Sequence, residues 1–102
     1  MGPFFVTRDE IQDLRNVSLT LRVNKKLRQE GNSKSMIRGF GDLLLYPSTE
    51  LTFYPGDILS GGTCKGTGLD LAPRDQNNNL VNDDLFLKHG DTIEATVEHI
   101  GT

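Results

Sequence analysis

The feature that most restricts the fold of this chain is an alternation of apolar and polar residues early in the sequence. Every second residue from Val17 to Val23 is apolar, and polar residues lie between them. Successive side chains of a strand point to opposite faces, so this pattern predicts a strand with one buried face. The segment Asn24-Lys25-Lys26 predicts a tight turn, after which residues 27–30 are expected to return antiparallel. The sequence therefore predicts a β-hairpin.

Shorter patterns in the rest of the chain predict further strands and a single helix. Three more segments are predicted to be strands: residues 3–7, 58–59 and 93–97. Apolar residues at helical spacing predict a short helix over residues 38–46, which Pro47 ends. Residues 85–87 are expected to return to the core. We therefore expect a mainly β (α+β) fold, with a twisted or barrel-like sheet and one short helix.

Composition limits both the core and the partners of the protein. At 102 residues the chain has room for one domain, and because only 35% of its residues are apolar the core is expected to be thin. The formal net charge of −3 argues against nucleic acid or an anionic membrane as a partner. The sequence has neither an apolar run long enough to span a membrane nor the basic start of a signal peptide. Its lone cysteine, Cys64, excludes an internal disulfide, and we expect a cytoplasmic protein.

A glycine-rich loop over residues 61–68 is the first candidate for chemistry. Glycine lets backbone N–H groups approach an oxyanion, and the hydroxyl of Thr63 or Thr67 adds a further donor. The loop is not a phosphate-binding P-loop, because no Gly-Lys-Ser/Thr occurs, and its glycine spacing differs from a dinucleotide fingerprint. Two interpretations stay open at this point: an anion-binding loop and a flexible surface turn.

A polar stretch over residues 73–84 contains part of a calcium-loop pattern. Asp75, Asn77 and Asn79 have the spacing of the first three ligands of an EF-hand. The glycine that such a loop requires is replaced by Leu80, and the bidentate acid at its end is missing. We therefore interpret the stretch as an exposed insertion.

Acidic residues and histidines near the end of the chain are the remaining candidates. Glu94 and Glu98, with Asp91 nearby, resemble a pair of carboxylates for Mg²⁺ binding or acid–base work. On a strand the two glutamates lie about 13 Å apart, which is too far for one ion, so an outward polar face is the better interpretation. His89 and His99 lack metal-ligand spacing, and we expect them at the surface.

Four stretches, taken in order, resemble the fumarylacetoacetate hydrolase family in the C-terminal part of its catalytic domain. They are similar to family patterns that begin G-P-W/F, contain L-x-L-x-V-N-G and R-Q-x-G, continue with P-G-D and a Gly-Thr loop, and close on F-L-K-P-G-D. The stretches are residues 2–11 (GPFFVTRDEI), residues 19–37 with RQEGNS inside, residues 55–68 with PGDILSGGT, and residues 86–91 (FLKHGD) with the closing Gly101-Thr102. Each stretch is weak alone, but the ordered set covers almost the whole chain.

The resemblance implies a twisted, mostly β catalytic domain, usually in a homodimer, that uses Mg²⁺ or Mn²⁺. Such enzymes act on 2-oxo acids or 1,3-dicarbonyl compounds as hydrolases or lyases, by C–C hydrolysis, decarboxylation, isomerisation or dehydration, with the metal polarising the carbonyl. The resemblance also makes Gly62 and Thr63 substrate-binding residues. The Thr63 hydroxyl would donate to a substrate oxygen, and Gly62 would permit the close approach.

The family's metal ligands and catalytic histidine lie upstream of its Gly-Pro segment. The resemblance therefore assigns no catalytic and no metal-binding residue to this chain, and Mg²⁺ or Mn²⁺ is expected in the full family enzyme rather than with this chain alone. We expect residues 1–102 to be a single partial domain, with Met1 an internal methionine of the family pattern. Cys64-Lys65 replaces the common Pro-Ala pair, which leaves the substrate open.

Three hypotheses about function remain. The chain is the C-terminal part of a metal-dependent enzyme and supplies its Gly-Thr loop, or it is a catalytically inactive β-rich remnant or assembly module, or its loop alone binds a small ligand. A sheet without its neighbouring strands exposes edges and apolar faces. We therefore expect a homodimer or a strand-exchanged oligomer.

Overall fold

The computed structural model describes residues 2–102, which form an elongated and loosely packed molecule. The radius of gyration is 16.6 Å, whereas a compact chain of this length has about 13 Å. The accessible surface is 8535 Å², whereas about 5,700 Å² is usual for a folded monomer of 11.3 kDa. The chain therefore leaves exposed a surface that a self-contained domain of its size would bury.

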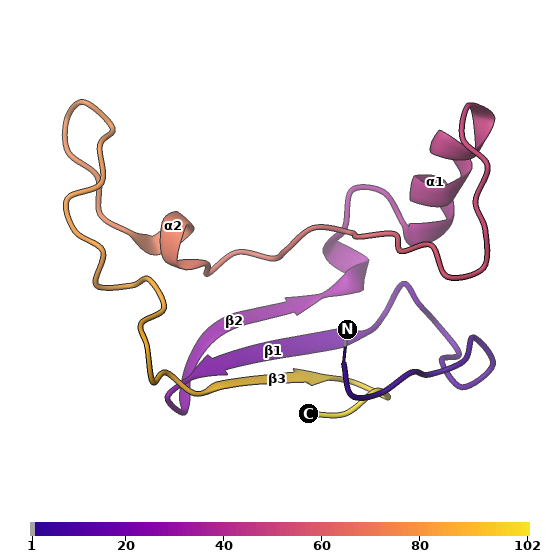
Figure 1. Cartoon of the computed structure of the whole chain (residues 1–102), viewed down its shortest axis with the longest axis horizontal. Coiled ribbons are helices and arrows are strands. Elements are labelled where there is room, and N and C mark those ends of the chain that lie inside the picture. The colour runs from indigo at the N-terminus through magenta and orange to yellow at the C-terminus, as the bar shows by residue number, and fades with distance from the viewer. Residues whose placement is uncertain (1) are drawn as a thin grey trace.

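The strands form one three-stranded antiparallel sheet, which lies along the lower side of the view in Figure 1. Its strands are β1 (Ser18–Val23), β2 (Lys26–Asn32) and β3 (Ile93–Val97), in the order β2-β1-β3. The predicted hairpin and the predicted strand over 93–97 are both confirmed. Asn24 and Lys25 have φ angles of 51° and 66°, which is the left-handed geometry of a two-residue turn that matches the twist of its strands.

A β-bulge interrupts the pairing of β1 with β2. Leu21 lies opposite Gln29, but the next residue of β1, Arg22, lies opposite Leu27. Arg28 is therefore the extra residue on β2. A bulge bends its strand and redirects the neighbouring groups, and this one lies beside the glycine-rich loop.

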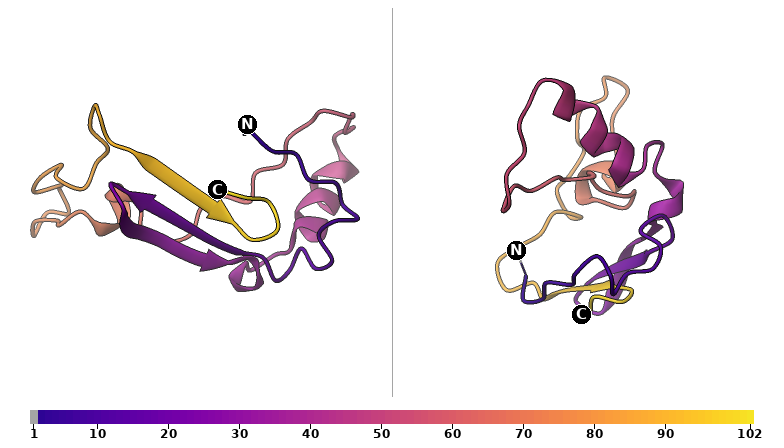
Figure 2. Two further views of the ribbon diagram at one scale, coloured as in Figure 1. Left: turned by 90° about the horizontal axis from the view of Figure 1, so that it is seen from below. Right: turned by 90° about the vertical axis from the view of Figure 1, so that its right-hand side faces the viewer.

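The predicted helix over 38–46 forms as α1 (Phe40–Leu45), and it ends just before Pro47 as expected. Pro47 then begins a 3₁₀ helix (Pro47–Thr49), and a second 3₁₀ helix (Ser33–Ser35) follows β2. A further one-turn helix, α2 (Gly68–Leu71), is not predicted by the sequence patterns and begins inside the predicted glycine-rich loop. The views in Figure 2 show α1 and the segment that follows it standing off one face of the sheet.

Two predicted strands do not form. Residues 3–7 and 58–59 carry apolar, β-prone side chains, but both segments are irregular in the structure. A strand requires a neighbour for its backbone hydrogen bonds, and neither segment lies in a sheet within residues 2–102. Propensity alone does not create that neighbour.

The core of the described residues is small. The buried apolar side chains are Ile11, Val17, Val23 and Ala72, whereas Leu19 and Leu21 in the middle of the predicted apolar face are only half-buried. The expected return to the core at residues 85–87 is partly wrong, because Leu87 is 59% exposed. Within residues 2–102 no helix has the length and apolar character that crossing a membrane requires.

Candidate functional site

The glycine-rich loop runs alongside β2 (Figure 1), in contact with Gln29 and Gly31. These two residues are two positions apart on a strand, so both face the loop. A Cβ on Gly31 would lie only 3.0 Å from the Cβ of Cys64. Glycine at position 31 therefore lets the loop approach the strand closely, and Cys64 is half-buried there.

The side-chain amide of Gln29 holds the loop. Its Nε2 atom donates to the carbonyl oxygen of Cys64 at 2.7 Å and to the hydroxyl oxygen of Thr63 at 3.0 Å, and it lies 3.4 Å from the carbonyl oxygen of Lys65. Gln29 is not among the site residues predicted from the sequence. The available signal was its place in the Arg28-Gln29-Glu30-Gly31 segment, which carried part of the family resemblance.

Gly66 completes the contact between the loop and β2. Its φ angle is +103°, and a Cβ at this position would overlap the carbonyl oxygen of Arg28, the bulged residue. The backbone N–H of Gly66 donates to Oδ2 of Asp70 at 2.7 Å. Only glycine fits both this backbone conformation and this approach.

The two predicted substrate-binding residues, Gly62 and Thr63, are adjacent and exposed in the loop. Gly62 has a φ angle of +83°, and a Cβ there would meet no atom within 4 Å. Thr63 presents its hydroxyl beside Gln29. The other candidate hydroxyl, that of Thr67, instead caps α2 by accepting from the N–H of Asp70 at 3.1 Å.

In the polar stretch that resembles part of a calcium loop, Asp75 forms hydrogen bonds with residues of the same stretch. The carboxylate of Asp75 accepts from the N–H groups of Asn77 and Asn79 at 2.9 and 2.8 Å, and from the side-chain amide of Asn79 at 3.2 Å. The hydrogen bond from the Asn79 N–H is the main reason that the pKa of Asp75 lies below its usual value. The stretch around Asp75 is exposed, as predicted.

The acidic residues near the end of the chain fasten β3 rather than converge on one point. Glu98 accepts from the N–H of Ser18 at 3.0 Å through Oε2, and its Oε1 lies 3.7 Å from Nε2 of His99. Asp91 closes the turn before β3 and accepts from the N–H of Lys88 at 2.8 Å. These carboxylates are engaged in holding the backbone.

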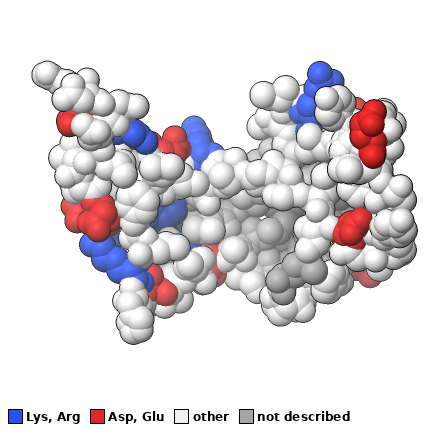
Figure 3. Space-filling view, turned by 45° about the horizontal axis from the view of Figure 1, so that its top comes forward, with Lys and Arg blue, Asp and Glu red and all other residues white. Residues whose placement is uncertain are grey.

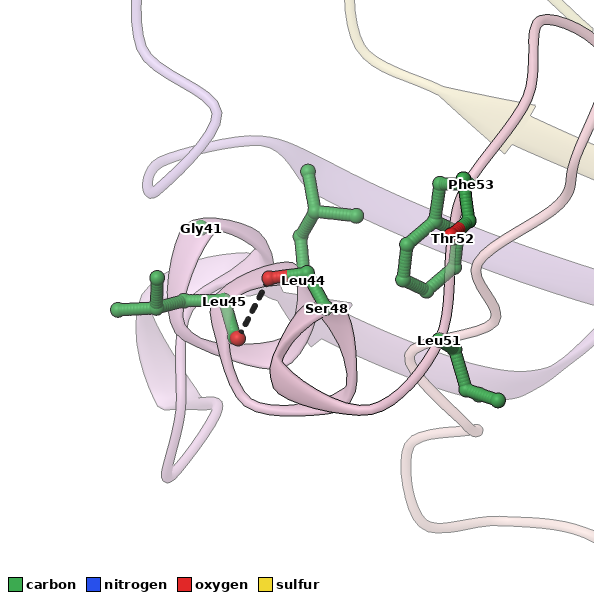
Figure 4. A pocket seen from close by; sticks show the side chains of 7 residues that line it. All are labelled: Gly41, Leu44, Leu45, Ser48, Leu51, Thr52 and Phe53. Carbon is green, nitrogen blue, oxygen red and sulfur yellow. Dashed lines mark hydrogen bonds between the residues drawn. The ribbon is translucent and has the colours of Figure 1, made fainter.

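An open apolar hollow of about 530 Å³ lies between α1 and the segment after it (Figure 4). A smaller hollow of about 220 Å³ lies near Arg15 and the 3₁₀ helix after β2. Gly62 and Thr63 line neither of them. The larger hollow is lined by Gly41, Leu44, Leu45, Ser48, Leu51, Thr52 and Phe53.

The comparison with known families accounts for the ordered stretches and for the loop. The model of the family described as fumarylacetoacetate (FAA) hydrolase C-terminal matches residues 1–102, the whole chain. The chain belongs to this family. Its glycine-rich loop and the Arg28-Gln29-Glu30-Gly31 segment that holds it are therefore parts of a fumarylacetoacetate hydrolase C-terminal domain.

Relatives and solved structures place the chain within longer proteins of this kind. An uncharacterised protein of Staphylococcus haemolyticus is 37% identical over 102 residues, which are the whole of this chain and 31% of the relative. A Mycobacterium smegmatis protein of known crystal structure matches with a TM-score of 0.78 and 26% identity, over 98% of this chain and 33% of that one. The maleylpyruvate hydrolase of Sphingobium sp. SYK-6 matches with a TM-score of 0.76 and 25% identity, over 98% of this chain and 31% of that one.

These matches confirm the predicted fold class, a β-rich portion of the fumarylacetoacetate hydrolase fold with a short helix. The chain spans about a third of the length of these proteins.

The family is typically metal-dependent, and proteins hold such ions with grouped His, Cys, Asp or Glu side chains. Among the residues that the structure describes, no three or more His, Cys, Asp and Glu side chains are grouped to hold an ion. Asp75, Asp91 and Glu98 instead accept hydrogen bonds from backbone N–H groups. The donor set of residues 2–102 therefore does not fit a metal centre.

Proposed function

We propose that this chain supplies the substrate-contacting Gly62-Thr63 loop of a fumarylacetoacetate hydrolase-family enzyme that acts on 2-oxo acids or 1,3-dicarbonyl compounds. Any Mg²⁺ or Mn²⁺ would be held by residues outside 2–102. The reaction would be C–C hydrolysis, decarboxylation, isomerisation or dehydration. The likeness to a maleylpyruvate hydrolase supports the hydrolytic option.

The observation that carries this proposal is the geometry of Thr63. Its exposed hydroxyl oxygen accepts from Gln29, and its proton faces the Cys64 carbonyl oxygen only at the long distance of 3.3 Å. This proton can therefore be donated instead to a carboxylate or carbonyl oxygen of the substrate. The neighbouring Gly62 carries no Cβ, and a backbone turn with φ +83° leaves open space around it. A donor held before the reaction begins stabilises developing charge without reorganisation.

A titration of the labelled chain with oxaloacetate or an acylpyruvate in the presence of Mg²⁺ tests the proposal. We expect the backbone amide resonances of Gly62 and Thr63 to shift. Thr63→Ser, which keeps the hydroxyl, should retain the effect, and Thr63→Val, which replaces it with a methyl group, should remove it. Unchanged wild-type spectra at millimolar ligand would contradict the proposal.

The absence of a metal-binding group within the described residues favours a second candidate. In this case the chain is a catalytically inactive β-rich module with a role in assembly. The same titration separates the two functions, because the inactive module binds no 2-oxo acid, with or without Mg²⁺.

We also propose that the chain associates with a second copy of itself. Its accessible surface is roughly 2,800 Å² larger than is usual for a folded monomer of this mass. A standard protein–protein interface buries about 800 Å² of each partner, so this excess is large enough to form one. Leu45 and Leu51, at the larger hollow, are 69% and 62% exposed. Figure 3 shows charged side chains gathered toward the two ends of one face, with a largely uncharged and hollowed middle.

A further inference from the structure

The amide group of Gln29 faces three oxygen atoms of consecutive loop residues. Two are the backbone carbonyl oxygens of Cys64 and Lys65, and the third is the hydroxyl oxygen of Thr63. Carbonyl oxygens can only accept hydrogen bonds, so the group that faces them must be the NH₂ of Gln29 and not its carbonyl oxygen. The direction of these hydrogen bonds therefore follows from chemistry alone.

We infer that Gln29 is a positioning residue that holds the 63–65 segment on β2 and fixes the Thr63 hydroxyl as a hydrogen-bond donor. The inference rests on the proposed function, in which that hydroxyl meets a substrate oxygen. Gln29 lies on β2 and not in the loop, and it acts through Thr63.

The donor role of Thr63 follows from counting its hydrogen bonds. A hydroxyl has one proton to donate, and its oxygen can accept. Gln29 donates to that oxygen at 3.0 Å, which leaves the proton for another acceptor. Among residues 2–102 the acceptor that faces it is the carbonyl oxygen of Cys64, which is 3.3 Å away and already accepts the 2.7 Å bond from Gln29. Hydrogen bonds from hydroxyls usually span about 2.5–3.0 Å, so an anionic ligand oxygen would compete well for this proton.

The position of Gln29 on strand β2 fixes its backbone. Gln29 is half-buried and pairs with Leu21 at the bulge, while Gly31 and Gly66 let the loop lie close on either side. A group held on a strand positions its partner more accurately than a group held on a loop. Gln29 therefore connects the sheet to the largely exposed loop.

Replacing this amide by a carboxylate removes the donors to the two carbonyl oxygens and reverses the hydrogen bond with the Thr63 hydroxyl. In Gln29→Glu the ionised side chain accepts only, so it opposes the Cys64 and Lys65 carbonyls and takes the Thr63 proton for itself. Gln29→Met removes the donors without adding charge. The matched control is Gln76→Glu, which makes the same change of charge at an exposed position in the 73–84 insertion.

The test uses the ¹⁵N-labelled full chain and two readouts. Without ligand, we expect the order parameters of residues 63–65 to fall from about 0.85 to below about 0.6 in both Gln29 variants and to stay unchanged in Gln76→Glu. With oxaloacetate and Mg²⁺, we expect the dissociation constant to rise at least tenfold for Gln29→Glu. Circular dichroism verifies that each variant keeps its sheet.

A reciprocal variant keeps the test decisive if the Gln29 variants do not fold. Thr63 is exposed, so Thr63→Val leaves the packing intact, and it should shift the side-chain NH₂ resonances of Gln29, whereas Thr63→Ser should not. Unchanged loop order in folded Gln29→Glu, or unchanged NH₂ resonances in Thr63→Val, overturns the inference. Equal oxaloacetate binding by wild type and Gln29→Glu also overturns it and leaves the proposed function standing. If the wild type binds no oxaloacetate, the proposed function fails, and loop order and NH₂ resonances alone decide the inference.

Discussion

The side chain of Asn24 joins the hairpin turn to Asp91, 67 positions later in the chain. Its Nδ2 donates to Oδ1 of Asp91 at 2.8 Å, and its Oδ1 accepts from the N–H of Thr92 at 3.0 Å. The same residue has the positive φ angle that the two-residue turn requires. Asn24 therefore shapes the hairpin and also fixes the beginning of β3 beside it.

Asn24→Gly should destabilise the fold while leaving the turn intact. Glycine adopts the positive φ freely, so the variant removes only the side-chain hydrogen bonds. Loss of the bond from Thr92 is expected to cost about 1 kcal/mol in the free energy of unfolding, measured by urea denaturation. Lys25→Gly, in the same turn, is the matched control and should be neutral or slightly stabilising. Equal stability of the two variants would contradict the role of the Asn24 side chain.

Low pH should destabilise the fold at β3, because the carboxylates of Asp91 and Glu98 accept hydrogen bonds at its two ends. Hydrogen bonds from the N–H of Lys88 and the side chain of Asn24 lower the pKa of Asp91 from its ordinary 3.8, and hydrogen bonding from Ser18 lowers that of Glu98 from 4.5. A group whose pKa is lowered by folding stabilises the fold above its ordinary pKa, and this contribution disappears as pH falls through the folded value. The urea concentration at the unfolding midpoint should therefore fall as the pH is lowered below about 4, whereas above about pH 6 these groups contribute in full and add no further pH dependence.

Glu98→Gln provides the control for this pH dependence. Glutamine retains an oxygen that can accept from Ser18 but does not titrate. The acid limb of the stability curve should therefore be shallower in this variant than in the wild type. An identical limb would mean that Glu98 does not contribute to it.

Gly66→Ala should be far more damaging than Gly56→Ala. The two glycines have nearly equal φ angles, +103° and +104°, so an alanine meets similar backbone strain at both, of about 1–3 kcal/mol. A Cβ at Gly56 would meet open space, whereas one at Gly66 would overlap the Arg28 carbonyl. We expect only Gly66→Ala to separate the loop from β2, seen as large shifts of the Arg28 and Gln29 amide resonances. Similar spectra for both variants would refute this contact.

Self-association should depend on the apolar hollow beside α1. Leu45→Glu places a charge on that surface and should lower the oligomer fraction measured by light scattering. Val81→Glu is the control, because Val81 is similarly exposed, at 60%, but lies in the polar insertion. A wild-type chain that is monomeric at all concentrations, or equal effects of the two variants, would count against the second-copy proposal.

Local patterns predicted the parts of the fold that depend on neighbouring residues. The hairpin, α1 and the strand over 93–97 follow from side-chain periodicity and turn residues. Two Gly-Asp turns, at Gly56-Asp57 and Gly90-Asp91, are equally local. In each the aspartate carboxylate accepts from the backbone N–H three residues earlier, at Tyr54 and at Lys88, and the glycine before it has a positive φ. Such turns need only four residues, so the sequence is sufficient to specify them.

Sequence patterns gave wrong predictions where an element needs a neighbouring strand or a packing surface elsewhere in the chain. Residues 3–7 and 58–59 have strand-like composition but no strand beside them within the described residues. Periodicity also predicted a buried face on β1, but Leu19 and Leu21 are only half-buried. Burial depends on what packs against a face, which no local pattern contains.

The same distinction between local pattern and tertiary contact applies to the candidate site. Sequence alone determined the glycine-rich loop, the resemblance to the fumarylacetoacetate hydrolase family and the choice of Gly62 and Thr63, because these are properties of residue type and order. Only the tertiary structure decided that Gln29 holds the loop and gives the Thr63 hydroxyl its direction. Gln29 and Thr63 are 34 positions apart, and a hydrogen bond across that separation exists only after the hairpin has formed and the chain has returned over it.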